Sequence, residues 1–454
     1  MLAEYLCNTQ TFWDLLVEET RRKVKPALPA LMPAPPPGVA DKNSINWLRR
    51  RIRTGRHQFS RLNGSAFAKL DETRPGIISL QGYLALNAEK RRDYRVTLLP
   101  KLPDKILLRA LSKKLAQTAP ENEFLPQACG YVPGRGGREV VRQIKGHLEA
   151  GRRVVLRFDV TSFNETVDQA LLLKILEPHL GRVHGWGQAD IILFISLLES
   201  YLARVGEALV SPGRGIGMGS PLTPWFTNLY LDQLDRFLSD NGHHFVRYGD
   251  DVAMFFENEG QAAAASSAIR SFIRDILHQG VSESKWLVKE LVPGASDGGI
   301  DFCLFHYSIA PRGQVDIRIK DATLEKVRRK IRYLTRIPAV DGDEESLFPI
   351  SGYTYFAVMA ISRRVGFQQS FPGGSLRKAM EFTGKGWGYW FTLDVRSESV
   401  YRQLRGLDAY IHGRLIKLEK HDHGKTSKTS KFYGRLRSFG LRTFMDAWQV
   451  TPKG

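Results

Sequence analysis

Two adjacent aspartates between two apolar runs constrain this chain more than any other feature. The segment FVRYGDDVAMFF (245–256) predicts two short strands, Phe245–Tyr248 and Val252–Phe256, around a tight turn that holds Asp250 and Asp251. Neighbouring charges beside apolar strands are costly unless a cation neutralises them. Carboxylate oxygens at a hairpin tip suit Mg²⁺, although a plain Gly-Asp turn explains the same dipeptide. The pattern therefore favours a cation-dependent site at the tip of a hairpin.

A third carboxylate precedes this pair. The segment VVLRFDVTSFNETVD (154–168) predicts a buried strand that ends in Asp159, followed by the start of a helix. Two divalent ions need such a third ligand, and together they activate a hydroxyl and stabilise the leaving oxygen of a phosphoryl transfer. The glycines of GIGMGSPLTPWFTNLYLDQLD (215–235) allow close approach of a nucleotide or template, and a helix begins near Pro224. The cations of KRRDYRVTLLPKLPDK (90–105) suit a triphosphate.

The remaining pattern is a mixture of helices and strands, which indicates an α+β chain. The prolines of 26–40 predict an extended linker because they remove amide donors and fix φ. A hairpin is expected from Phe302–Ile309 and Val315–Ile319. The expected helices are 8–25, 46–61, 107–117, 140–148, 171–180, 191–202, 261–280 and 323–334.

In this order, the motifs resemble the fingers and palm of reverse transcriptases, particularly those of group II introns and related bacterial enzymes. The resemblance covers roughly residues 88–320 and continues more weakly to the end. It implies a right-hand polymerase with fingers, a palm built on an antiparallel sheet, a helical thumb and a basic, helical, maturase-like C-terminal region. The implied segments are an N-terminal helix with Pro-rich linker (1–40), a basic extension (41–85), fingers and palm (86–310), thumb (311–395) and maturase-like region (396–454).

The resemblance also assigns the catalytic residues. Asp159 matches the first catalytic aspartate, and Asp250 with Asp251 matches the metal-binding pair. It implies two Mg²⁺ ions, for which Mn²⁺ is a possible substitute, with the backbone carbonyl of Val160 completing the coordination. Lys285, or with less support Lys289, resembles the lysine that protonates the leaving pyrophosphate. An ordinary surface charge explains either lysine equally well.

The nucleotide site departs from the family at two positions. Asn164 stands where an aromatic gate against the ribose 2′-hydroxyl is usual, with Phe163 one residue earlier, and Met218 stands where a glutamine is usual. Both changes bear on sugar selection, because asparagine is small and can hydrogen-bond a hydroxyl. Arg95 matches the arginine of the fingers that contacts the triphosphate. The full expected set is Arg95, Lys90, Lys101, Val160, Phe163, Asn164, Met218, Gly219, Ser220 and Pro221.

The positive charge is concentrated at two places. Of the net charge of +19, residues 41–61 carry +6 and residues 311–454 carry +13, which leaves the other 289 residues neutral. Such segments favour a polyanion. GYVPGRG (130–136) further resembles the template-contacting loop of the family. The expected nucleic-acid contacts are Arg49, Arg50, Arg51, Arg53, Arg135, Asn228, Tyr248, Arg328, Arg329, Arg414, Arg435 and Arg437.

Three C-terminal segments resemble the RNA-binding part of the family. These are the tryptophan-centred GKGWGYWF (384–391), LRGLDAYIHGRL (404–415) and RLRSFGLRTF (435–444). An amphipathic helical bundle that only packs against itself accounts equally well for Leu404, Leu407, Tyr410 and Ile411. The primer-grip hairpin lacks its usual glycine and has Cys303-Leu304-Phe305 instead.

Several classes of protein are disfavoured. Three scattered cysteines exclude a disulfide framework and a zinc ribbon, and no run of 18 apolar residues or secretory signal is seen, so we expect a cytoplasmic chain without a membrane partner.

We expect an RNA-directed DNA polymerase that takes an RNA template, a DNA or RNA primer and nucleoside triphosphates, with a structured non-coding RNA as a further candidate partner. The alternatives are relaxed sugar selection or untemplated addition, and an RNA-binding maturase or splicing factor with an idle polymerase site. No Cys/His endonuclease motif follows, which favours a domesticated role in anti-phage defence or repair.

Overall fold

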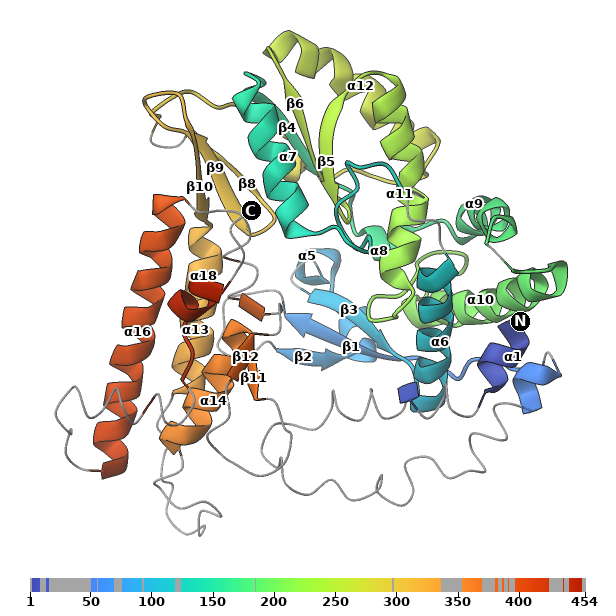
Figure 1. Ribbon diagram of the computed structural model, residues 1–454. Coiled ribbons are helices and arrows are strands. Elements are labelled where there is room, and N and C mark those ends of the chain that lie inside the picture. Colours follow the sequence, from blue (N-terminus) through green and yellow to red (C-terminus); the bar gives the residue numbers. More distant parts are fainter. Residues whose placement is uncertain are drawn as a thin grey trace. The chain divides into compact units, whose positions relative to one another are not determined.

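The computed structural model divides into two compact units (Figure 1). The first unit comprises Met1–Gly136 and Gly151–Glu290, and the second comprises Gly137–Ala150 and Leu291–Gly454. The residues that the structure describes are 2–8, 14–15, 50–54, 56–68, 76–91, 94–118, 124–183, 185–295, 298–335, 353–369, 380–382, 386–387, 391, 397–423, 436 and 441–450.

A four-stranded antiparallel sheet, here called the palm sheet, lies at the centre of the first unit. Its strands, in spatial order, are β5 (His244–Tyr248), β6 (Asp251–Phe256), β4 (Val154–Asp159) and β7 (Leu287–Glu290). Residues alternate between the two faces of a strand, and Leu156, Phe158, Val252 and Met254 share one face and join the main hydrophobic core. Asp159 and Asp251 therefore lie on the opposite face.

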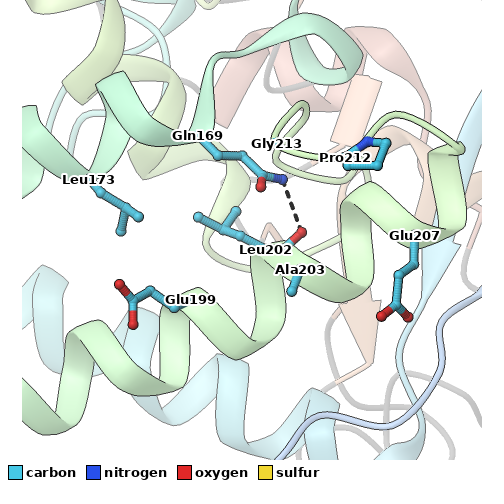
Figure 2. A pocket seen from close by; sticks show the side chains of 8 residues that line it. All are labelled: Gln169, Leu173, Glu199, Leu202, Ala203, Glu207, Pro212 and Gly213. Carbon is cyan, nitrogen blue, oxygen red and sulfur yellow. Dashed lines mark hydrogen bonds between the residues drawn. The ribbon is translucent and has the colours of Figure 1, made fainter.

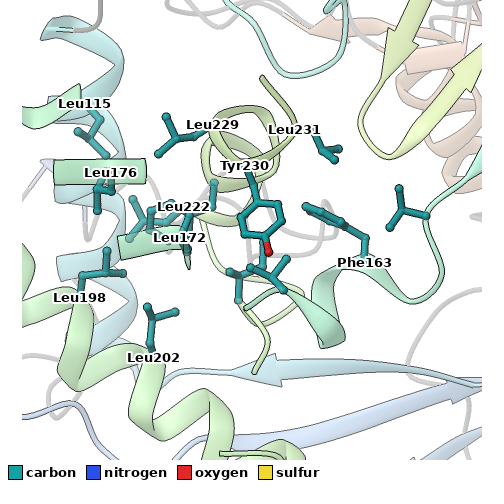
Figure 3. Packing of buried hydrophobic residues seen from close by; sticks show 14 of the residues in the cluster. Leu115, Phe163, Leu172, Leu176, Leu198, Leu202, Leu222, Leu229, Tyr230 and Leu231 are labelled. Atoms are coloured by element: carbon teal, nitrogen blue, oxygen red, sulfur yellow. The ribbon is translucent and has the colours of Figure 1, made fainter. Parts of the chain in front are cut away.

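Helices surround this sheet, with α11 and α12 packed against it (Figure 1). Figure 3 shows the core, in which leucines of α6, α9, α10 and α11 pack near Tyr230 and Phe163. The helices of this unit are α1 (Leu2–Cys7), α4 (Leu80–Leu84), α5 (Ala88–Arg91), α6 (Leu102–Thr118), α8 (Phe163–Thr166), α9 (Gln169–Gly181), α10 (Gln188–Leu209), α11 (Thr223–Asp240), α12 (Glu259–Asp275) and the 3₁₀ turn η1 (Glu283–Lys285). A smaller antiparallel sheet has the order β2 (Ile77–Ser79), β1 (Asn63–Ala68) and β3 (Tyr94–Leu99).

The second unit combines a small sheet with helices. Its elements are α7 (Gly137–Glu149), β8 (Ile300–Phe302), β9 (Phe305–Ile309), β10 (Val315–Ile319), α13 (Asp321–Leu334), α14 (Tyr353–Val365), β11 (Phe367–Gln369), β12 (Met380–Phe382), α16 (Glu398–His423) and α18 (Phe444–Val450). Gln403 of α16 pairs with both the amide and the carbonyl of Ile319 in β10, and Asp408 of α16 accepts the amides of Phe444 and Met445 at the start of α18. Polar side chains of α16 thus join the elements of this unit.

Most expected elements are confirmed, and the differences have local causes. The helix expected over 261–280 ends at Asp275, and the strand expected over 302–309 is interrupted at Cys303, whose φ is 49°. The N-terminal helix is Leu2–Cys7, and most of the helix expected over 8–25 lies outside the described residues, as does the Pro-rich linker 26–40.

The basic helix expected over 46–61 is wrong in its second half. Residues 50–53 are helical, but residues 56–62 form no helix or strand. The backbone there is bound by side chains of neighbouring helices: the amide of Phe59 donates to Ser200, and the amide of Ser60 donates to Asp104. These contacts replace the hydrogen bonds that a helix would supply.

The expected five-segment organisation stays a prediction. The two compact units meet in sequence near residue 290, and α7 belongs to the second unit although both of its neighbours along the chain belong to the first. Within the described residues, no helix has the length and apolar character needed to cross a bilayer.

Candidate active site

Strand pairing brings the three predicted catalytic aspartates to one edge of the palm sheet. Asp159, the last residue of β4, is the register partner of Asp251, the first residue of β6. Asp250 lies in the turn just before Asp251, and its carbonyl accepts a hydrogen bond of 3.4 Å from the amide of Val160. Directly opposite residues of antiparallel strands have Cβ atoms about 5 Å apart. Residues 91 or more positions apart in the sequence therefore meet as neighbours.

Two cations face these carboxylates. Arg157 makes a two-point contact with Asp251, at 3.1 Å from Nε to Oδ1 and 3.0 Å from Nη2 to Oδ2. The Lys285 ammonium donates to Oδ2 of Asp159. Lys285 was expected at the site, but Arg157 was not. The available signal for Arg157 was its place two residues before Asp159, because residues i and i+2 of a strand share a face.

The negative charge of Asp250 is less well compensated by neighbouring cations than the charges of Asp159 and Asp251. Burial, and next the charge of Asp159, raises the pKa of Asp250 to about 6. In the part of the chain that the structure describes, no group of three or more His, Cys, Asp or Glu side chains is arranged to hold a metal ion as it stands. Two of the three aspartates are instead paired with Arg157 and Lys285. The donor set still fits Mg²⁺, which prefers carboxylate oxygens.

The glycine-rich loop after α10 is bound to strand β3. The carbonyl of Met218 accepts a 2.9 Å hydrogen bond from the amide of Leu98. Gly219 has φ +99°, and a Cβ at this position would lie 2.9 Å from Cγ2 of Thr97. Only glycine combines this backbone conformation with so close an approach. Ser220 is buried, and the Pro221 carbonyl accepts from Ser112. The expected nucleotide loop is therefore held rigidly beside the strand that carries Arg95.

Arg95 lies near the loop that follows Asp159. Burial raises the pKa of Glu165 in α8, while the backbone amide of Val96 and the charge of Arg95 act against that rise. Arg95 itself is exposed, as are Lys90 and Lys101. The structure thus brings the expected triphosphate arginine close to the segment that contains Asn164.

Phe163 and Asn164 differ sharply in their surroundings. The Phe163 ring is buried and packs edge-on against Tyr230, with centroids 5.8 Å apart, so the structure places this predicted nucleotide contact in the core instead (Figure 3). The Oδ1 atom of Asn164 is buried without a hydrogen-bond partner among the described residues, while its carbonyl accepts from Ile216. Of the two candidates, only Asn164 keeps a polar group unsatisfied.

Two expected nucleic-acid contacts instead hold the loop 124–136. Asn228 is buried, and its Nδ2 donates to the Gly130 carbonyl at 2.8 Å. Arg135 donates to the carbonyls of Phe124, Leu125 and Ala128. A phosphate contact by Arg135 would have to replace some of these bonds. Tyr248 is half-buried, and its ring lies 5.7 Å from that of Tyr131.

The other expected arginines are divided between contacts and solvent. Arg414 in α16 donates to the hydroxyl and carbonyl of Thr335, so it joins α16 to the end of α13. Arg328 lies 4.0 Å from Glu325, and the guanidinium of Arg51 donates to the carbonyl of Arg56. Arg50 and Arg53 are exposed, and Arg329 is half-buried. Arg49, Arg435 and Arg437 lie outside the described residues.

Aromatic rings from two of the C-terminal motifs pack together. The rings of Trp387 and Phe444 are stacked, with their centroids 6.4 Å apart, and the centroids of the Phe391 and Phe444 rings are 5.8 Å apart. Leu404, Leu407 and Ile411 are fully buried, and Tyr410 is half-buried. The packing interpretation is confirmed for the three aliphatic residues.

A separate pocket of about 350 Å³ lies in the first unit between α9, α10 and residues 212–213 (Figure 2). Glu199 and Glu207 line it, as does Gln169, whose amide donates to the Leu202 carbonyl at 2.9 Å. None of the predicted site residues is among its lining. Its acidic lining does not suit a triphosphate.

The sequence between residues 87 and 292 matches the family model described as reverse transcriptase (RNA-dependent DNA polymerase). The chain contains a reverse transcriptase domain. This domain is an RNA-directed DNA polymerase, and therefore a nucleotidyltransferase, and it includes Arg95, the loop at Gly219, Lys285 and all three aspartates. The mixed helix and sheet architecture of the first unit agrees with the expected α+β class.

Solved structures share a weaker likeness with this chain. The telomerase of Candida albicans in complex with a TWJ fragment of telomeric RNA has 11% identity over 90% of this chain and 71% of that chain, with a TM-score of 0.44. Apo telomerase of Candida tropicalis has 10% identity over 99% and 81%, with a TM-score of 0.42. A partial Cas6-RT-Cas1–Cas2 complex has 17% identity over 61% and 43%, with a TM-score of 0.32. These values add nothing to the family match, and a search of curated proteins found no match.

Proposed function

We propose that Asp159, Asp250 and Asp251 hold two Mg²⁺ ions, with Mn²⁺ as a possible substitute, and that the enzyme extends a primer on an RNA template at this edge of the palm sheet. The observation that supports this is the register of β4 and β6, which sets Asp159 opposite Asp251 beside the half-buried Asp250. The backbone carbonyl of Val160 is a further proposed ligand. When bound, Mg²⁺ would activate the primer hydroxyl and offset the charge that develops on the phosphates.

The side chains around the aspartates then have distinct tasks. Arg95 neutralises the triphosphate, with Lys90 and Lys101 as assisting cations. The rigid backbone at Gly219 supports the nucleotide, so that positioning contributes to the rate. Lys285 transfers a proton to the leaving pyrophosphate, for which its ammonium must leave Asp159. Arg157 must likewise share or release Asp251 when a cation binds there.

The proposed partners are an RNA template, a DNA or RNA primer and nucleoside triphosphates, with a structured RNA as a further partner of the basic C-terminal region. We place the enzyme among group II intron-like bacterial reverse transcriptases, in the cytoplasm, with a role in anti-phage defence or repair. The net charge of +13 over residues 311–454 supports RNA binding there. The maturase-like character of this region is part of the same proposal.

The test is primer extension by the Asp250→Ala/Asp251→Ala double variant. We expect Mg²⁺-dependent extension of a primed RNA to fall by at least about a thousandfold, the scale of losing a main electrostatic element of a site. Asp275→Ala, which removes an exposed carboxylate of the same unit, is the matched control and should extend normally. Undiminished extension by the double variant would contradict the assignment of Asp250 and Asp251 to the metal site.

A second candidate activity is relaxed sugar selection or untemplated addition. The unpartnered Oδ1 atom of Asn164 favours it, because a ribose hydroxyl could donate to this acceptor. Incorporation of dNTPs and rNTPs by wild type and Asn164→Phe decides the matter. Strong exclusion of rNTPs by the wild-type enzyme would show that the idea is wrong. A splicing factor with an idle polymerase site is less favoured, because all three aspartates and Lys285 are present together.

A further inference from the structure

The largest fully buried side chain among the described residues is an arginine. Arg247 lies on β5, two residues before Gly249 and three before Asp250, and neither it nor Asp235 of α11 reaches solvent. Its Nε donates to Oδ1 of Asp235 at 2.7 Å, and its Nη2 donates to Oδ2 at 2.5 Å. The guanidinium and the carboxylate therefore form a two-point ion pair in the protein interior.

The same guanidinium reaches the metal-binding turn. Its Nη1 donates to the Gly249 carbonyl at 3.0 Å and to Oδ1 of Asn228 at 3.0 Å. Gly249 directly precedes Asp250, so the orientation of this carbonyl bears on the backbone that carries the aspartate.

A second segment is bound through the same residues. The amide of Arg247 donates to the Gln127 carbonyl, and the Arg247 carbonyl accepts from the amide of Cys129, both at 2.9 Å. Asn228, which accepts from Arg247, donates to the Gly130 carbonyl. The loop 127–131 and the turn are thus attached to α11 through one polar network.

The loop and the turn are also in direct contact. A Cβ added to Gly130 would lie 2.6 Å from the amide nitrogen of Gly249, and a Cβ added to Gly249 would lie 3.3 Å from the ring of Tyr131. Tyr131 has φ 62° and is 55% exposed, so its strained backbone presents a ring to solvent next to the turn. The two glycines therefore let the backbones of the loop and the turn approach each other closely.

Stability alone does not explain this buried pair. Burial of two charges costs several kcal/mol per ion, and apolar residues of similar volume often serve equally well or better. What apolar residues cannot supply is the donor that holds the Gly249 carbonyl. We propose that Arg247 is a positioning residue: it fixes the backbone conformation of the turn that carries Asp250 and holds the loop 127–131 against that turn. This rests on the proposed metal site at the aspartates.

The experiment replaces the whole pair with apolar residues. In Arg247→Met/Asp235→Leu no buried charge is left unpaired, so the full chain should still fold, with its unfolding temperature lowered only by the lost hydrogen bonds to Asn228 and Gly249. We expect its dissociation constant for Mn²⁺ alone, followed by electron paramagnetic resonance, to rise about tenfold, the size of one lost positioning hydrogen bond. The Mg²⁺ midpoint of primer extension should rise in parallel, with a lower kcat.

Two further variants keep the proposal open to refutation. Arg247→Lys retains the charge but cannot reach Asp235 and Gly249 together, so it should also weaken Mn²⁺ binding. It takes the place of the double variant if that variant does not fold. Arg274→Met/Asp275→Leu removes an exposed two-point pair on α12 and should bind Mn²⁺ as wild type does. Wild-type Mn²⁺ affinity in a folded Arg247→Met/Asp235→Leu chain, or in Arg247→Lys, would overturn the proposal.

Failure of the proposed function is distinguishable from failure of this inference. If Asp250→Ala/Asp251→Ala binds Mn²⁺ as wild type does, the metal site itself is wrong. If only that variant loses Mn²⁺, the site stands and the role of Arg247 falls. Amide hydrogen exchange adds an independent reading: amides of 128–131 and 249–251 should exchange faster together in the Arg247 variants, and acceleration of one segment alone contradicts the coupling.

Discussion

The two faces of the palm sheet each carry an arginine–aspartate pair, and the pairs differ in their access to water. The side chains of Arg157 and Asp251 are 25% and 22% exposed, whereas those of Arg247 and Asp235 are fully buried. Arg247 is the register partner of Val252, so it points to the face opposite Asp251. An ion pair that water reaches can be exchanged for an incoming cation at small cost, and a dry pair cannot. The wet pair, Arg157 with Asp251, therefore suits exchange with a metal ion, and the dry pair, Arg247 with Asp235, suits fixed positioning of the backbone.

The largest effect is expected where the dry pair is broken. Asp235→Ala leaves the charge of Arg247 buried without its partner, and the free energy of unfolding should fall by about 3–5 kcal/mol. Chemical denaturation of the full chain, followed through the first unit, measures this. Asp275→Ala is the control and should stay within about 0.5 kcal/mol of wild type. A loss as small as that of the control would remove the distinction between the two faces.

The amide next to the dry pair should come second. Asn228→Ala removes an acceptor for Arg247 and the donor to Gly130, and leaves buried polar groups unsatisfied, so we expect a loss of about 1–3 kcal/mol. The same denaturation experiment applies. Asn241→Ala, which removes a single exposed hydrogen bond to the Phe237 carbonyl, should cost much less. Equal losses in the two variants would contradict a network role for Asn228.

An intermediate, pH-dependent effect is expected at Asp168, the N-cap of α9. Burial acts to raise its pKa, but His278, the amides of Leu171 and Ala170, and Arg214 together lower the pKa below its ordinary value of 3.8. A carboxyl with a depressed folded-state pKa contributes stability above its unfolded pKa, and this contribution is lost as the pH falls through the folded value.

Asp168→Ala should therefore cost about 0.5–2 kcal/mol at pH 7. The difference from wild type should shrink as the pH falls through and below about 4, near the ordinary pKa of aspartate. Asp168→Asn keeps an acceptor for the helix amides and should lose less. A difference that is independent of pH would show that the charge of Asp168 contributes nothing.

The smallest effect on stability is expected at the wet pair. Arg157→Leu removes a half-exposed partner of Asp251 and should lower the free energy of unfolding by at most about 1 kcal/mol. Because Asp251 is then no longer shared, we expect Mn²⁺ to bind at least as tightly as in wild type, opposite to the expectation for the Arg247 variants. A loss above about 3 kcal/mol would place Arg157 with the buried pair.

Strands and helices could be predicted from the sequence where the residues of the element itself determine its structure. The β-branched, apolar runs before Asp159 and around Asp250 predicted β4, β5 and β6, because such side chains fit a buried pleated surface. The end of α12 at Asp275 and the loss of helix over 56–62 were not predictable. In the second case, side chains of α6 and α10 hydrogen-bond that backbone, and the chain alone does not say which helices will lie beside it.

The candidate site divides in the same way. The three aspartates and Lys285, which the resemblance to reverse transcriptases implied, do lie together, and their catalytic roles stay a prediction. Phe163 lies in the core, whereas the next residue, Asn164, is half-buried, because one position of difference changes the direction in which a side chain points. The signal for Arg157 was its place two residues before Asp159 on the same strand, whereas Arg247 carried no distinguishing local signal.

The sequence by itself determined which groups are available: acidic residues at strand ends, glycines where the backbone must approach closely, and two basic segments. Only the tertiary structure decided which of these groups meet. Arg157 and Asp251 are 94 residues apart, and Lys285 and Asp159 are 126 apart. The physical reason is that strand register and helix packing are set by burial of whole apolar faces, so the partner of a charged side chain is a consequence of the fold and not of its neighbours in the chain.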